Sequence, residues 1–172
     1  ETAPRGSGFL AELCEEWERA ALAAETPRTR VVCPRLGVVL GHDGGALERM
    51  LPVFRKGLGG RLGSGRAWLS WISLRDVVSA LGALATDARW SGPVNLVAPQ
   101  PVTQADFARL LGQALRRPAL LPVPAWLLKM ALGEMASAML LASQRVEAAK
   151  LRTGGFVFSD QELGSLLQRE LR

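Results

Sequence analysis

Tyrosine is absent from this 172-residue chain, which contains only two cysteines and one histidine. Without tyrosine, no phenol of the chain can move a proton in catalysis. Cys14 and Cys33 lie far apart with no histidine near either, so their spacing fits neither a zinc site nor a disulfide framework. Free, buried thiols are the simpler interpretation. His42, beside Asp43, is a loop histidine or, as the alternative, part of a general base.

Long uninterrupted apolar runs are also lacking. The most apolar stretch, residues 119–132, contains Pro122, Pro124 and Lys129 and is too short and broken to cross a bilayer. The first residues have no apolar core of the kind found in signal peptides. We therefore expect a soluble, cytoplasmic protein with no membrane partner. The chain has no initiating methionine and soon enters an amphipathic segment, so we expect it to be part of a longer protein.

The chain carries a net charge of +5, which raises the question of nucleic-acid binding. Its arginines are scattered, however, and the one Arg-Arg pair is Arg116 with Arg117. No basic run alternates with aromatic residues. A solvated basic surface is the favoured interpretation, and no nucleic-acid partner is expected. With 48% hydrophobic and 22% charged residues, the composition is that of an ordinary globular protein.

Hydrophobic periodicity predicts alternating strands and helices. Residues 9–24 have apolar positions at helical spacing and predict a helix with one face buried. The β-branched, apolar run 31–40 predicts a strand buried on both faces, interrupted at Pro34 because proline lacks a ladder donor. Further helices are predicted at 46–56 and 75–85, an extended segment at 68–72, and a strand at 93–98. This alternation indicates an α/β protein.

Helices dominate the rest of the chain. Thr103 and Asp106 form a capping box before a helix that ends near residue 115. Helices are also predicted at 126–132 and 136–150, and a last one extends to residue 171 after a cap at Ser159. We therefore expect two units, residues 1–118 and residues 119–172, the second mostly helical.

A glycine-rich loop spans residues 57–65, with the spacing G-x-G-G-x-x-G-x-G. This differs from the dinucleotide fingerprint G-x-G-x-x-G, and the loop follows a predicted helix instead of a strand. The loop is therefore either a plain surface turn or, less favoured, a place where backbone amides approach an anionic ligand.

Several segments together resemble one family, the atypical extended short-chain dehydrogenase/reductases known as epimerase family proteins or nucleoside-diphosphate-sugar epimerases. The matching segments are residues 8–18, 35–47, 50–60, 63–66, 70–72, 92–95, 143–146 and 155–158, with Asp76 and Lys150. The resemblance covers essentially the whole chain. It implies the second half of a Rossmann-like parallel sheet with a mostly helical substrate lobe, and an N-terminal half that is missing.

The resemblance also implies a site. Arg35, Leu36, Gly37 and Val38 would approach the nicotinamide end of NAD(P), with NADP favoured, once the missing half is present. The substrate, a small molecule such as a nucleotide sugar, would be contacted by residues after the strand: Gly63, Ser64, Gly65, Arg66, Trp71, Ser73 and Asp76. No metal site is implied.

The chain departs from the family pattern at functional positions. Many relatives use a Tyr-x-x-x-Lys pair to move a proton, whereas this chain has no tyrosine. Ser73 stands where the family has histidine, and Glu147 where it usually has proline. We expect the chain alone to be inactive and to need its missing half or a homodimer partner. The alternative is a truncated, non-catalytic module for binding or dimerisation.

Overall fold

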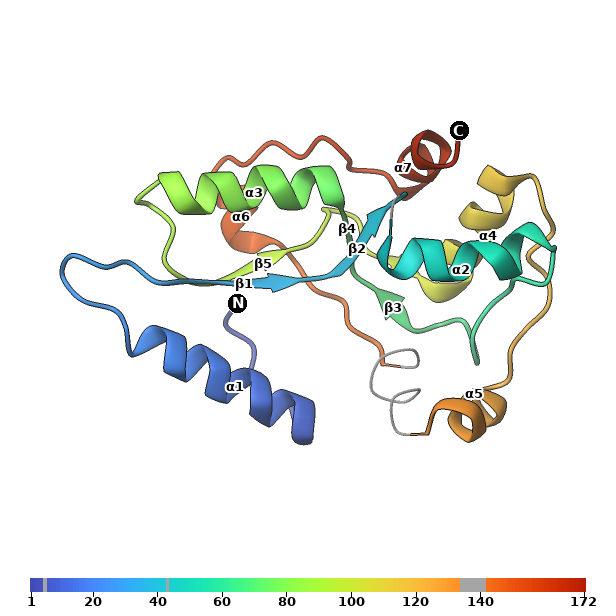
Figure 1. Cartoon of the computed structure of the whole chain (residues 1–172), viewed down its shortest axis with the longest axis horizontal. Helices are drawn as coiled ribbons and strands as arrows, with labels where there is room; N and C mark the ends of the chain where they lie inside the picture. The colour runs from blue at the N-terminus through green and yellow to red at the C-terminus, as the bar shows by residue number, and fades with distance from the viewer. Residues whose placement is uncertain (5, 43, 134–141) are drawn as a thin grey trace.

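The computed structural model describes the chain except residues 5, 43 and 134–141 (Figure 1). Its two parallel ladders pair β1 (Val32–Leu36) with β5 (Gly92–Leu96) and β2 (Val38–Gly41) with β4 (Trp71–Ser73). A short antiparallel ladder, not predicted from the sequence, joins β3 (Trp68–Leu69) to β6 (Val102–Thr103). Parallel strands that alternate with helices confirm the predicted α/β class.

The predicted strand 31–40 is divided at Gly37, and the expected interruption at Pro34 is wrong. Pro34 lies within β1 and aligns with Val94 of β5. At Gly37 the chain changes partners: the Gly37 amide donates to the Leu96 carbonyl (3.0 Å), and the Val38 amide donates to the Ser70 carbonyl (2.9 Å). The two ladders therefore meet at this glycine.

Seven helices are found in the described residues: α1 (Phe9–Leu22), α2 (Gly45–Arg55), α3 (Leu74–Thr86), α4 (Gln104–Leu115), α5 (Ala125–Leu132), α6 (Ala149–Thr153) and α7 (Leu163–Glu170). The predicted capping box before α4 is confirmed. The Asp106 amide donates to Thr103 Oγ1 (3.1 Å), and that hydroxyl donates to Asp106 Oδ2 (2.7 Å). This reciprocal pair satisfies a free amide at the start of the helix.

Two helix predictions in the C-terminal part are wrong. Residues 142–148 are not helical, because their backbone bonds to β3 and to Ser70 instead; the preceding residues of the predicted helix lie largely outside the described chain. The last helix begins at Leu163 with Glu162 at its N-cap, and no side chain caps it. Ser159 does not cap it, because the amides of Ser159 and Asp160 donate to the carboxylate of Asp76.

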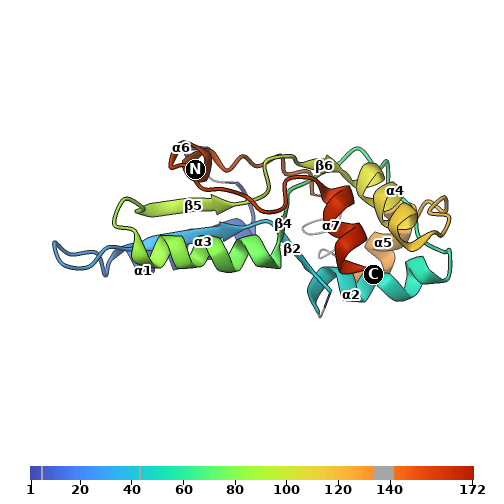
Figure 2. The ribbon, with the colours of Figure 1, turned by 90° about the horizontal axis from the view of Figure 1, so that it is seen from above.

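Two hydrophobic cores lie on opposite faces of β2 and β4. Leu40 and Trp71 belong to a core shared with α2, α4 and α7, whereas their chain neighbours Val39 and Ile72 face a core shared with α3 and α6. Successive side chains of a strand point to opposite faces, so burial on both sides requires apolar residues at adjacent positions. Figure 2 shows α2, α4 and α7 gathered at one end of the molecule, away from α1 and β1.

The other end of the molecule is more exposed than the sequence predicted. The last three residues of β1 are exposed, and among the described residues β1 pairs only with β5. No residue of α1, which is described in full, is buried; Trp17 remains 66% exposed. The predictions that β1 is buried on both faces and α1 on one are wrong for the described chain, because none of its other elements covers them. Cys14, on α1, is exposed as well, and only Cys33 is buried.

Candidate functional site

The junction at Gly37 is the first part of the candidate site. A Cβ atom at Gly37 would lie 2.8 Å from the Ser70 carbonyl oxygen and 2.9 Å from Val97 Cγ1. Real Cβ atoms avoid such distances, so only glycine fits between these neighbours. The glycine is thus explained by packing between the two ladders.

Arg35 and Leu36, the predicted cofactor residues before Gly37, lie on the exposed edge of β1. The Arg35 guanidinium donates two hydrogen bonds to the Glu18 carboxylate of α1, Nε to Oε1 and Nη2 to Oε2, each 2.6 Å long. This bidentate pair lowers the pKa of Glu18 below its ordinary value and raises that of Arg35. Leu36 is 52% exposed. The edge therefore presents an apolar side chain and a neutralised ion pair.

The glycine-rich loop pairs with a later segment of the chain. The Leu121 amide donates to the Gly59 carbonyl (3.2 Å), the Val123 amide to the Arg61 carbonyl (2.9 Å), and the Gly63 amide to the Val123 carbonyl (2.8 Å). A Cβ atom at position 60 would lie 1.9 Å from the Leu121 carbonyl oxygen. Close approach of two backbone segments explains glycine here. Of the predicted substrate residues in this loop, Ser64 and Arg66 are exposed and Gly65 is buried.

Trp71, Ser73 and Asp76, the other predicted substrate residues, are buried and bonded within the chain. Asp76 is 0% exposed, and its two carboxylate oxygens accept hydrogen bonds from the amides of Ser159 (2.8 Å) and Asp160 (3.0 Å). Ser73 Oγ accepts from the Asp76 amide (3.1 Å), and Trp71 Nε1 donates to the Gln100 carbonyl (2.9 Å). These contacts hold the C-terminal segment against α3. Their role toward a substrate stays a prediction.

Sequence reasoning missed the contact between β3 and residues 143–146. Ser70 Oγ donates to the Gln144 carbonyl (2.8 Å) and accepts from the Val146 amide (2.9 Å). The Arg145 guanidinium lies over the Trp68 ring, 4.8 Å from its centroid, in a cation–π contact. Because the Ser70 carbonyl also binds Val38, this serine connects the strand junction to the exposed Trp68–Arg145 pair. Both segments stood in the family pattern, but no local periodicity links residues so far apart.

The remaining titratable groups give no metal centre. Within the described ranges, no group of three or more histidine, cysteine or acidic side chains could hold an ion. The His42 backbone amide donates to Glu170 Oε2 (3.0 Å). Its neighbour Asp43 lies outside the described residues, so the proposed general base is not tested. Burial raises the pKa of the Cys33 thiol, which favours its neutral form.

Comparison with known proteins places the chain. It is 47% identical over 162 residues to an epimerase family protein of Mycobacterium bovis, matching 94% of this chain and 54% of that protein. It is 44% identical over 158 residues to the chloroplastic epimerase family protein SDR39U1 homolog of Arabidopsis thaliana, matching 92% and 45%. The chain belongs to the epimerase family. It spans about half the length of these relatives.

A solved structure supports the same assignment. The crystal structure of human epimerase family protein SDR39U1 (isoform 2) with NADPH superposes with a TM-score of 0.90 at 37% identity, over 99% of this chain and 58% of that one. Residues 123–170 also match a family described as a domain of unknown function, DUF1731. None of the helices in the described residues is long and apolar enough to span a membrane.

Proposed function

We propose that this chain is the C-terminal half of an enzyme that binds NADP(H) and acts as an epimerase or oxidoreductase on a small molecule, with nucleotide sugars as the first class to test. The observation that carries the proposal is the open edge of β1. In the described residues this parallel strand has one partner, and its exposed residues include Arg35 and Leu36. A further parallel strand on that edge would require a crossover connection from another part of the protein.

The relatives supply what the missing partner would be. The human relative, of which this chain matches 58%, was crystallised with NADPH. In the proposal, an N-terminal half adds strands to the β1 edge and covers α1, and the nicotinamide approaches Arg35, Leu36, Gly37 and Val38. The chain on its own offers no phosphate cradle in its glycine loop, because at least three of that loop's backbone groups bond to residues 121–123. The cofactor phosphates are therefore assigned to the N-terminal half.

Bound NADPH would supply a hydride. The chain's contribution in the proposal is to position and enclose: Ser64, Arg66 and the Trp68–Arg145 pair present polar and aromatic groups at the surface, and Asp76 holds the lobe together. No tyrosine of this chain can move the accompanying proton. That step is assigned to the other half.

The experiment compares NADPH binding by the 172-residue chain with binding by the longer polypeptide that extends it at its N terminus, using NADPH fluorescence. The longer protein should bind NADPH and the chain alone should not. Leu36→Asp should abolish binding by the longer protein, because a charge on the β1 edge opposes pairing. The matched control is Val157→Asp, at a position that is 82% exposed and outside the β1 edge. Equal NADPH binding by the Leu36→Asp variant would refute the proposed edge.

The same edge supports one alternative, a non-catalytic module that dimerises through β1. An unpaired strand edge is a template for pairing with another chain. Light scattering distinguishes the two: a dimer of the longer protein that binds no NADPH and dissociates with Leu36→Asp would favour the module.

A further inference from the structure

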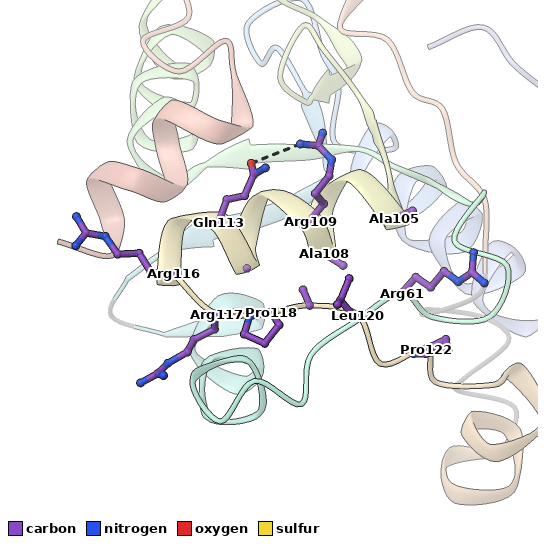
Figure 3. Close-up of a pocket in the computed structure, with 12 residues that line it drawn as sticks. Arg61, Ala105, Ala108, Arg109, Gln113, Arg116, Arg117, Pro118, Leu120 and Pro122 are labelled. Atoms are coloured by element: carbon purple, nitrogen blue, oxygen red, sulfur yellow. Dashed lines mark hydrogen bonds between the residues drawn. The ribbon is translucent and has the colours of Figure 1, made fainter.

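A groove of about 620 Å³ lies between α4 and the segment 117–122, at the helical end of the molecule (Figure 3). Its volume lies in the range of small-molecule sites. None of the cofactor or substrate residues predicted from the sequence lines it. The groove is thus separate from the proposed active site.

Four arginines surround this groove: Arg61, Arg109, Arg116 and Arg117. Figure 3 shows Arg116 and Arg117 at one end of it and Arg61 near the other. Arg109 donates to Asp106 (3.0 Å), whereas the other three make no ion pair or side-chain hydrogen bond within the described chain. No acidic side chain is among the described residues that line the groove. The guanidinium groups are therefore available to an anion.

Between the arginines the surface is apolar. Ala105 and Ala108 of α4 face Pro118, Leu120 and Pro122 across the groove (Figure 3). Leu120 is 83% exposed, which is unusual for a leucine that no described residue covers. An apolar body with a charged group would satisfy both parts of this lining.

The backbone at Arg116 adds a second observation. Arg116 caps α4 in the left-handed conformation, with φ 53°, and it is the one residue other than glycine with positive φ among those described. Glycine or asparagine usually occupies that position, because a side chain there is strained. Strained residues cluster at binding sites. An arginine retained here is explained if its guanidinium binds a ligand.

We infer that this groove binds a small organic anion that combines an apolar ring or chain with a phosphate or carboxylate group. The apolar part lies against Leu120 and the small side chains of α4, and the anionic group accepts hydrogen bonds from Arg116 or Arg117. Guanidinium forks match phosphate and carboxylate oxygens in pairs. The site is independent of the proposed function, since it shares no residue with the cofactor edge.

The test uses 1-naphthyl phosphate as the probe, titrated by calorimetry into the purified chain with and without NADPH. Saturable binding that weakens with added salt is expected, with weaker binding of 1-naphthol and of inorganic phosphate, since each has only half of the recognised chemistry. The double variant Arg116→Ala/Arg117→Ala should bind at least about tenfold more weakly. Leu120→Ser should weaken binding too.

The matched control is Arg28→Ala/Arg152→Ala, which removes the same charge from exposed positions outside the groove. It should bind the probe as the parent does. Equal loss in the control would reduce the effect to net charge and overturn the inference, as would no saturable binding. Displacement of the probe by NADPH would also overturn it, because the probe would then occupy the cofactor site. Failure to bind NADPH, measured separately, bears on the proposed function alone.

Discussion

Replacing Asp76 by asparagine tests whether this residue holds the C-terminal segment in place. Both carboxylate oxygens accept backbone amides, from Ser159 at 2.8 Å and from Asp160 at 3.0 Å, and the side chain is 0% exposed. An amide of the same shape keeps one acceptor but turns an NH₂ group toward a backbone N–H. One hydrogen bond to a charged acceptor is lost and two donors are left facing each other without water.

The expected cost is about 3 kcal/mol in the free energy of unfolding, since a hydrogen bond to a charged group contributes about 1.5–3 kcal/mol and a buried unsatisfied donor costs about 1–3 kcal/mol. For a chain of this size that corresponds to a fall in Tm of about 6–12 °C. Urea unfolding followed by tryptophan fluorescence measures the loss, and amide exchange at Ser159 and Asp160 should accelerate more than exchange in α4. Asp87→Asn is the matched control, because that carboxylate pairs only with the exposed Arg89 beside it in the described chain. A loss below about 1 kcal/mol, or one equal to the control's, would refute the reasoning.

Three shorter predictions follow. Because the Arg35 pair lowers the pKa of Glu18, its stabilisation is present above the unfolded carboxyl pKa and is lost as pH falls through the folded value; amide exchange in α1 should therefore accelerate below about pH 4.3, and Glu18→Gln should remove this dependence. Gly37→Ala should lower the free energy of unfolding by about 1–3 kcal/mol through overpacking, whereas Gly82→Ala, with open space around it in α3, should raise it by about 0.5–1 kcal/mol in the same urea titration; equal effects would contradict the packing at position 37. Arg116→Gly should raise Tm, because glycine fits the left-handed cap, while weakening the groove's affinity for 1-naphthyl phosphate; an unchanged Tm would argue against strain there.

Local patterns in the sequence were enough for the elements whose partners lie nearby. The box of Thr103 and Asp106 located the start of α4, since both hydrogen-bonding groups are three residues apart. The same type of pattern failed at Ser159, where a distant carboxylate, Asp76, takes the amides that a capped helix would use. The difference lies in long-range competition, which local spacing does not encode.

The candidate site followed the same division. The family resemblance placed Gly37 at a constrained position, but the constraint comes from Ser70 and Val97, which approach it from other strands. The glycine loop was open to a ligand interpretation because glycine permits close approach by any group, and the sequence does not say that Leu121 is the group that approaches. The Trp68–Arg145 contact was not predicted because it has no periodic signature.

The division of adjacent residues between two cores also limits which length changes the protein tolerates. Val39 and Leu40, and likewise Trp71 and Ile72, serve opposite sides of their strands. Inserting or deleting a single residue in β2 would exchange every side chain between the two interiors at once, while the loop before α5 has no such alternation to lose. Insertions and deletions in homologous genes should therefore be rare within these two short strands and concentrate in the connections outside them.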